Sequence, residues 1–121
     1  IAPIIAGGNT VVVLASDSKP LCSITFAEVL HTSDVPGGAV NILTGHRSEL
    51  LEHFSSHMDV NAIVYCGTDN DEITLVQQNA ALNVKRPVVY TDQDWMDNTV
   101  QDPYRILNTL ETKVTWHPVG V

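Results

Sequence analysis

The side chains best suited to chemistry gather in residues 65–72, which read YCGTDNDE. The thiol of Cys66 precedes Gly67 and Thr68, and three carboxylates follow within the next four residues. An apolar run over residues 62–65 predicts a strand before the turn, and apolar residues at roughly helical spacing predict a helix after it. A strand, a tight turn and a helix form the half-unit of nucleotide-binding α/β domains. A site of the usual α/β kind is therefore expected at this turn.

This turn is poor in glycine and rich in acid. It has one glycine, Gly67, where a dinucleotide-binding loop has two or three. A pyrophosphate needs close backbone N–H groups and favours a neutral or positive surface. Asp69, Asp71 and Glu72 stand beside its expected position, and each contact would cost on the order of a few kcal/mol at an effective dielectric of about 20. The same acids also complement the positive N-terminus of a helix, which is a purely structural role.

Several residues elsewhere in the chain have both a chemical and a structural interpretation. Cys66 stands where a helix N-terminus lowers a thiol pKa, but no base is identifiable beside it, and a small buried residue is the simpler interpretation. His53 and His57 share a helix face but lack a clear third zinc ligand, which favours solvated or capping histidines. The aspartates of residues 92–102 lack the glycine and glutamate of a calcium loop. No catalytic or metal-binding residue is expected.

Composition and charge exclude several classes of function. The chain has 121 residues, 44% of them hydrophobic and 17% charged, as in one soluble globular domain. The net charge of −8 argues against nucleic acid or an anionic membrane as partner, and no apolar run approaches the about 20 residues that span a bilayer. Two cysteines without metal-type spacing indicate reduced thiols in a cytoplasmic protein. Because the chain begins at Ile1 without Met, we expect a fragment of something longer.

Strands and helices are expected to alternate along the chain. Apolar or β-branched runs predict strands at 9–14, 39–43, 62–65 and 85–90. Helical spacing predicts helices at about 20–32, 47–57, 70–83 and 102–111, with an apolar approach over 1–8 and a last short strand at 114–116. The connections are too long for hairpins, so they imply right-handed crossovers and a mostly parallel sheet.

The predicted fold class is therefore α/β, with residues 1–121 as a single domain. We expect a Rossmann-like, three-layer arrangement in which a mostly parallel sheet of about 4–5 strands carries helices on both faces. The helix at 20–32 is expected to bury an apolar face that includes Leu21, Ile24 and Val29. Trp95 and Trp116 are expected to be core or interface anchors.

A series of short motifs runs through residues 1–86 in a fixed order. Its members are Pro3, Ala6-Gly7-Gly8-Asn9-Thr10-Val11-Val12, Pro20-Leu21, Val35-Pro36-Gly37-Gly38-Ala39-Val40-Asn41-Ile42, Thr44-Gly45, His57, Asp59-Val60, Gly67-Thr68 and Asn83-Val84-Lys85-Arg86. In order and spacing the series resembles the nucleotide-binding domain of the aldehyde dehydrogenase superfamily. The remaining residues look like the closing segment of a shortened, degenerate module, of the kind some two-module members carry.

The resemblance implies where a cofactor would bind and what has been lost. It places the remnants of a site for NAD(P) at Ser16, Asp17, Gly45, Gly67 and Thr68. Asp17 stands for the family's acidic residue that takes the ribose hydroxyls. These five positions are expected to be vestigial.

The departures from the family pattern fall on its functional positions. Leu14 replaces the lysine that holds the adenosine ribose, Arg47 stands where a small residue is usual, and Glu72 replaces a glycine beyond the Gly-Thr turn. Tyr90 stands at the position of the general-base glutamate. The family's catalytic cysteine lies in a part of the fold that this chain does not contain. We therefore expect weak or no NAD binding, although NAD(P) stays possible.

Three functional hypotheses follow. The leading one is a non-catalytic domain that serves the assembly or regulation of a larger oxidoreductase. It would form a homodimer, or dock on a larger aldehyde dehydrogenase module, through the helix at 70–83, because the resemblance implies that this helix packs across a two-fold axis. The second is the cofactor-binding part of an active NAD(P)-dependent aldehyde dehydrogenase whose catalytic cysteine lies elsewhere in the parent chain. The third is a nucleotide sensor that holds adenosine through Asp17.

Overall fold

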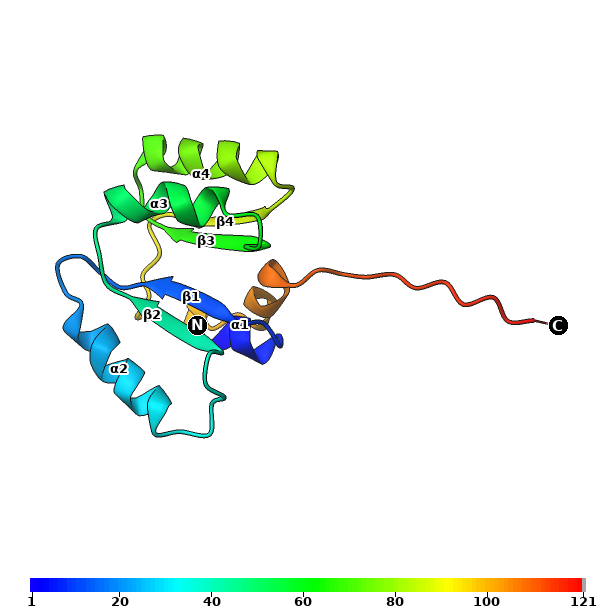
Figure 1. Cartoon of the computed structure of the whole chain (residues 1–121), viewed down its shortest axis with the longest axis horizontal. Helices are drawn as coiled ribbons and strands as arrows, with labels where there is room; N and C mark the ends of the chain where they lie inside the picture. Colours follow the sequence, from blue (N-terminus) through cyan, green and yellow to red (C-terminus); the bar gives the residue numbers. More distant parts are fainter. Residues whose placement is uncertain (121) are drawn as a thin grey trace.

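The structure, a computed structural model, describes residues 1–120 and shows alternating helices and strands followed by an extended tail (Figure 1). The elements are α1 (Ala2–Ala6), β1 (Val11–Leu14), α2 (Leu21–His31), β2 (Val40–Leu43), α3 (Arg47–Ser56), β3 (Ala62–Cys66), α4 (Asn70–Leu82), β4 (Arg86–Tyr90) and the 3-10 helices η1 (Asn98–Val100) and η2 (Pro103–Thr109). The four strands β1 to β4 and the helices α2, α3 and α4 lie within a few residues of their expected bounds.

All strand pairing is parallel, and it occurs in two pairs. Strand β1 pairs with β2 from Val11 opposite Val40 to Leu14 opposite Leu43. Strand β3 pairs with β4 from Ala62 to Cys66. The α/β fold class with parallel strands and crossover helices is therefore confirmed, but the described strands form two two-stranded ladders where one sheet of about 4–5 strands was expected.

The hydrophobic core lies between the second strand pair and two helices. Figure 1 shows α3 and α4 side by side along β3 and β4, with α2 on the far side of the molecule next to β2. Alternation along β3 turns Ile63 and Tyr65 toward α3 and α4, where they pack with Leu51 and Val76. Val76 is fully buried. This core holds the turns after β2 and β3 at fixed positions.

The predicted burial of the N-terminal half is wrong. Helix α2 has no buried residue, and Leu21 is 77% exposed. Strand β1, expected to be covered on both faces, also has no buried residue. The apolar face of α2 exists in the sequence, but residues 1–120 supply no second layer to cover it.

The C-terminal predictions are corrected as well. The segment expected as an α-helix is the 3-10 helix η2, which starts at Pro103 and is capped by the side chain of Asp102. The strand expected at 114–116 is absent, because this segment extends away from the body without a pairing partner among the described residues (Figure 1). Trp95 and Trp116 are both exposed and are not core residues.

Helix α4 ends in a left-handed turn at Val84. The N–H of Lys85 donates to the carbonyl of Ala80 at 2.9 Å, as in a Schellman cap, and Val84 has a φ of +52°. A positive φ is costly for a β-branched residue. The side chain is 91% exposed, so burial offsets little of that cost.

We expect Val84→Gly to raise the free energy of unfolding by about 0.5–1 kcal/mol, because glycine relieves the strain but adds some chain entropy to the unfolded state. Urea denaturation measures this change. The matched control is Val119→Gly, because Val119 is equally exposed but lies in the extended tail and should change stability by less than about 0.5 kcal/mol. A loss of stability in the Val84 variant would contradict the assignment of strain.

Candidate functional site

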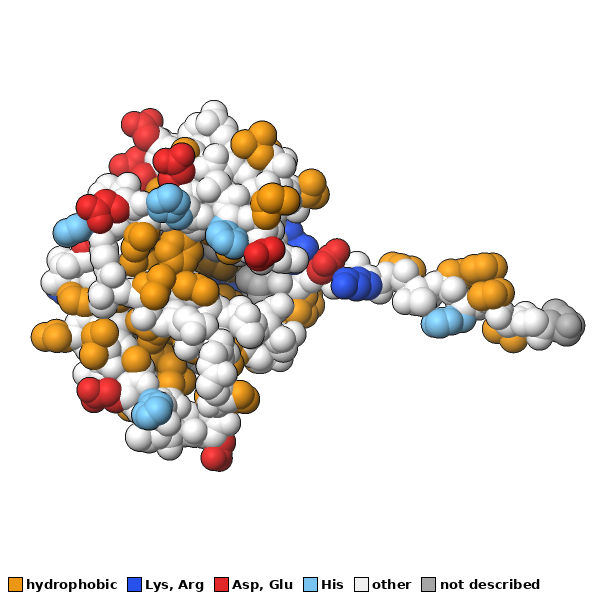
Figure 2. All heavy atoms as spheres, viewed as in Figure 1, with side chains coloured by type: hydrophobic (Ala, Val, Ile, Leu, Met, Phe, Trp, Pro, Cys, Tyr) orange, Lys and Arg blue, Asp and Glu red, His pale blue; other side chains and the backbone are white. Residues whose placement is uncertain are grey.

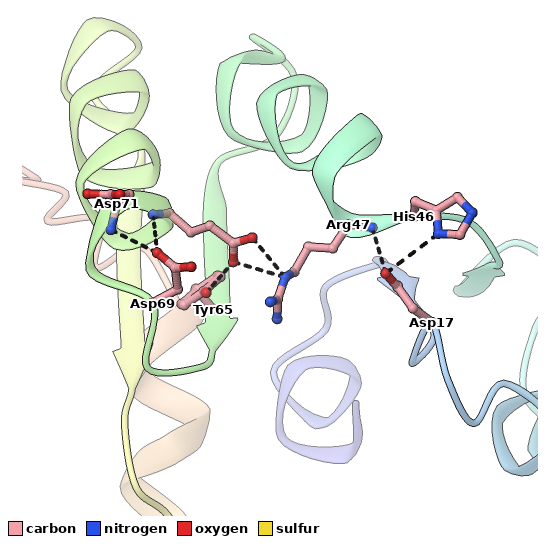
Figure 3. Close-up of polar contacts among 7 residues, drawn as sticks. Asp17, His46, Arg47, Tyr65, Asp69 and Asp71 are labelled. Atoms are coloured by element: carbon pink, nitrogen blue, oxygen red, sulfur yellow. Dashed lines mark hydrogen bonds and ion pairs between the residues drawn. The ribbon is translucent and has the colours of Figure 1, made fainter.

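The turns that follow β1, β2 and β3 meet through a chain of charged side chains. Asp17 follows β1, Arg47 opens α3 after β2, and Glu72 lies in the first turn of α4 after β3. Figure 3 shows Asp17 beside the start of α3, from which the side chain of Arg47 extends toward Tyr65. In open α/β sheets the carboxyl ends of the strands are where ligands bind. We call the linked residues Asp17, His46, Arg47, Tyr65 and Glu72 the strand-end network.

The first link of the network caps α3. The Oδ2 atom of Asp17 accepts the backbone N–H of Arg47 at 3.2 Å and lies 3.9 Å from Nδ1 of His46. His46 is the N-cap residue of α3 but makes no capping bond with its own side chain. Asp17 therefore supplies the negative charge that a helix N-terminus favours. An anionic ligand at this helix end would have to share that position with a carboxylate.

The second link is an ion pair between two turns. The Nε atom of Arg47 lies 2.9 Å from Oε2 and 3.1 Å from Oε1 of Glu72. The hydroxyl of Tyr65 donates to Oε2 of the same carboxylate. The guanidinium carbon of Arg47 also lies 5.9 Å from the centroid of the Tyr65 ring. Glu72 therefore has a guanidinium and a phenol as partners, and Arg47 has a carboxylate and a ring.

Tyr65 is buried, and its surroundings disfavour the phenolate. Burial, then the hydrogen bond to Glu72 and the charge of that carboxylate, raise the pKa of Tyr65 from 10.0 to about 12, against the opposing charge of Arg47. A folded-state pKa above the unfolded value means that the folded protein holds this proton more tightly. The stability from this site is therefore present below about pH 10 and is lost as the pH rises from about 10 to about 12.

Side chains of the protein itself limit the space at the two glycines expected at the site. A Cβ atom at Gly67 would lie 2.8 Å from the hydroxyl oxygen of Tyr65 and 3.0 Å from its Cζ. A Cβ atom at Gly45 would lie 2.9 Å from Cδ1 of Leu50. The Tyr65 ring occupies the space above the Gly67 turn, and Leu50 occupies the space above Gly45. A bound ligand is not needed to explain either glycine.

The acidic cluster after β3 performs a structural role at the start of α4. Oδ1 of Asp69 accepts the backbone N–H groups of Asp71 at 2.9 Å and Glu72 at 3.2 Å, which caps α4. Ser16 and Thr68, two further expected site residues, are exposed and lie outside the strand-end network. The structure thus brings Asp17 into the network. It places Gly67 against the Tyr65 ring and Gly45 against the side chain of Leu50.

The charged and polar groups at these turns are already partnered within the chain. Three carboxylates, those of Asp17, Asp69 and Glu72, surround the region, and its guanidinium, Arg47, is already paired. The capped N-termini of α3 and α4 have their first N–H groups bonded to chain carboxylates. A pyrophosphate would need those N–H groups and that cation free.

Cys66 differs from its expected burial. Strand alternation turns it away from the core face of β3, and the residue is exposed. Burial of the thiol nevertheless raises the pKa of Cys66, and the charge of Arg105 opposes that effect only in part. This shift disfavours the thiolate, which is the nucleophilic form of cysteine.

The histidines and aspartates considered as metal ligands do not converge on a metal site. Within residues 1–120, no group of three or more His, Cys, Asp or Glu side chains is placed to hold a metal ion. In the same range, no helix combines the length and the apolar character that crossing a bilayer would require.

Sequence reasoning missed the link between Arg47, Tyr65 and Glu72. Arg47 and Glu72 are 25 residues apart, and each is a separate departure from the family pattern at its own turn. The strands before them, β2 and β3, belong to different pairs, so neither strand register nor sequence spacing signals the contact. The packing of α3 against α4 brings the two N-terminal turns together.

Parallel strands joined by crossover helices, with polar side chains at the strand ends, are typical of a Rossmann-like α/β fold. The aldehyde dehydrogenase family profile matches residues 1–91, and the chain belongs to this family.

Relatives and a solved structure agree with this assignment. Aldehyde dehydrogenase 1 of Tanacetum cinerariifolium is 34% identical over 85 residues, which are 70% of this chain and 17% of that protein. Hydroxyisobutyraldehyde dehydrogenase of Mycolicibacterium austroafricanum is 31% identical over 109 residues, 84% of this chain and 22% of that protein. A crystal structure of aldehyde dehydrogenase from Bartonella henselae superposes with a TM-score of 0.67 at 28% identity, over 72% of this chain and 18% of that one. The chain thus spans about a fifth of the length of these proteins.

The strand-end network predicts how the pKa of Tyr65 responds when the charge of Glu72 is removed. Glu72→Gln should lower the pKa of Tyr65 below about 12, because it removes a negative charge from the phenol, but the pKa should stay above 10.0 because burial is the larger cause. Carbon-13 NMR of tyrosine labelled at Cζ follows the titration directly. Glu49→Gln is the matched control, because Glu49 is exposed in the first turn of α3 and outside the network. An unchanged Tyr65 midpoint in Glu72→Gln would show that the carboxylate does not act on the phenol.

Proposed function

We propose that this chain is a non-catalytic aldehyde dehydrogenase-like domain that serves the assembly or regulation of a larger oxidoreductase, with weak or no NAD binding. One observation carries the proposal. The carboxylates of Asp17 and Glu72 already hold the N-terminus of α3 and the guanidinium of Arg47. The groups that would receive a pyrophosphate are partnered within the chain.

Electrostatics favour the same conclusion. Two unit charges about 4 Å apart interact by about 4 kcal/mol at an effective dielectric of about 20, and salt screening reduces this at an exposed site. A pyrophosphate would meet Asp17, Asp69 and Glu72 while Arg47 had to leave its carboxylate. Leu14 supplies no compensating charge at the end of β1. The repulsion is large enough to move a micromolar dissociation constant into the millimolar range.

The residues at the strand ends also support a role without catalysis. Tyr90 ends β4, and its hydroxyl accepts a hydrogen bond from Nδ2 of Asn108 at 2.8 Å, so this position holds a phenol where a general base would be a carboxylate. The two cysteines of the chain are Cys22 in α2 and Cys66, whose thiolate is disfavoured by burial. We assign no catalytic role to any residue of the described chain.

A second candidate function follows from the share of the family that the chain covers. The chain spans about a fifth of its relatives, one of which is the NADP/NAD-dependent aldehyde dehydrogenase PuuC of Escherichia coli. This second function is that of a cofactor-binding part of an active NAD(P)-dependent enzyme whose catalytic cysteine lies elsewhere in the parent chain. Asp17 and the Gly67-Thr68 turn would then contact the cofactor.

A titration with NAD separates the two functions. We expect no saturable change in the backbone amide shifts of residues 16–18 and 67–69 below millimolar NAD, because the carboxylates of the network repel the pyrophosphate. The double variant Leu14→Lys with Glu72→Gly adds a cation and removes a carboxylate, and it should bind NAD at least tenfold more tightly.

The control for that titration is Lys19→Gln with Glu49→Gly, which alters one cation and one carboxylate at exposed positions outside the network. It should leave the NAD response unchanged. Micromolar binding by the unaltered chain, with shifts confined to the two turns, would overturn the proposed function in favour of the enzyme part.

Exposed apolar surface supports the assembly role. Leu21, Met58 and Leu82 are each at least 77% exposed, and Figure 2 shows hydrophobic side chains at the surface of the body and along the tail. Exposed apolar surface of this extent is typical of proteins that bind partners. The proposed contact face is the outer side of α4, the helix that ends at Leu82. This face would pair with a second copy of the chain or dock on a larger aldehyde dehydrogenase module.

Gel filtration with light scattering tests the assembly face. At about 0.5 mM the chain should elute as a dimer, and Leu82→Glu should shift it toward monomer because the new charge would be buried in the contact. Val119→Glu adds the same charge at an equally exposed tail residue and should leave the dimer intact. A monomer at every concentration would contradict the proposed homodimer, and docking on a larger module would be the remaining proposal. A dimer unaffected by Leu82→Glu would exclude α4 as the face.

A further inference from the structure

A cavity of about 350 Å³ lies on the face of β3 that points away from the hydrophobic core. Val64 and Cys66 form its floor, because strand alternation turns them opposite to Ile63 and Tyr65. Residues of α1 and η2 form two of its walls. Its volume falls in the range of small-molecule sites. None of the strand-end network residues lines it, so it is separate from the vestigial cofactor site.

One wall of the cavity is a guanidinium that packs against two aromatic rings. The Cζ atom of Arg105 lies 4.5 Å from the centroid of the Tyr90 ring and 5.2 Å from that of Trp95. The two rings are nearly perpendicular, at 86°, with centroids 5.7 Å apart. Nη2 of Arg105 donates to Oε1 of Gln93 at 2.7 Å. The rings and this bond fix the plane of the guanidinium, which reduces the entropy cost of using it for recognition.

The same guanidinium has a donor without an acceptor. The Nε atom of Arg105 is buried and makes no hydrogen bond within the described chain. No carboxylate of residues 1–120 lies within ion-pair distance of Arg105. A buried donor left unpaired lowers stability, and more so when the group carries a charge. The acceptor that restores this loss most effectively is a planar anion that takes two parallel N–H bonds, as a carboxylate does.

We propose that this cavity binds a small organic carboxylate with a flat apolar body. The carboxylate accepts from the guanidinium of Arg105, and Asn108 stands beside it as a further polar group of the wall. The apolar body contacts Val64, Trp95 and Ile4. Because burial disfavours the Cys66 thiolate, the floor adds little negative charge that would repel the ligand. This site is independent of NAD binding and of the assembly face.

Benzoate is a suitable probe, and benzamide is its neutral analogue of the same shape. Titration of the full 121-residue chain, followed by backbone amide shifts, should show saturable benzoate binding at Cys66, Tyr90 and Asn108. Benzamide should bind at least tenfold more weakly, because it lacks the charge that pairs with Arg105. Arg105→Lys keeps a positive charge but loses the planar fork, and it should weaken benzoate binding about tenfold.

The controls separate recognition from loss of fold. Lys113→Gln removes one positive charge from an exposed residue outside the cavity and should leave benzoate affinity unchanged. No benzoate response up to about 10 mM in the unaltered chain would overturn the proposal. Equal binding of benzoate and benzamide would also overturn it, because the cavity would then be a plain apolar hollow. The comparison of the two probes uses the unaltered chain and therefore holds even if Arg105→Lys disturbs η2.

Discussion

The ion pair between Arg47 and Glu72 links the N-terminal turns of α3 and α4 at the edge where the strands end. Its carboxylate also accepts from Tyr65, and its arginine opens the helix that Asp17 caps. Both charged side chains are partly exposed, so the pair itself contributes about 1 kcal/mol or less. Its importance is positional, because the two N-terminal turns of α3 and α4 face each other across it. The core formed by Leu51 and Val76 lies directly behind these turns.

This constraint changes what the fold can do with its strand ends. A Rossmann-like domain normally leaves helix N-termini and small residues open at this edge for a phosphate. Here the N–H groups of α3 and α4 are capped by Asp17 and Asp69, and the ring of Tyr65 lies over Gly67. The chain keeps the architecture of its family while its own side chains occupy the ligand-binding edge. Leu21 of α2 and Leu82 at the end of α4 are among the large hydrophobic side chains left exposed, which supports the proposed role in assembly.

Apolar spacing is a local property of the sequence, so it predicts the four paired strands and the helices α2, α3 and α4. The structural role expected for the acids after β3 is also a local signal, because carboxylates favour a helix N-terminus, and Asp69 caps α4. Pairing between strands is not local, and the division into two ladders could not be derived from the chain. The Arg47–Glu72 pair depends on side-chain reach between distant turns, and the Arg105 cavity depends on four segments that meet only in the fold. The expected burial of α2 is wrong because an apolar stripe indicates which face of a helix could be buried but not which element covers it.

The ring of Tyr65 above Gly67 has a consequence for how such a domain can change over evolutionary time. Restoring a small residue at Glu72 alone would leave the Tyr65 hydroxyl and the Arg47 guanidinium without their shared acceptor. Removing Tyr65 alone would open a hole in the core beside Val76. A single substitution at either position therefore lowers stability by removing a partner of the others. The network couples these positions, so that Arg47, Tyr65 and Glu72 are expected to change together rather than one at a time.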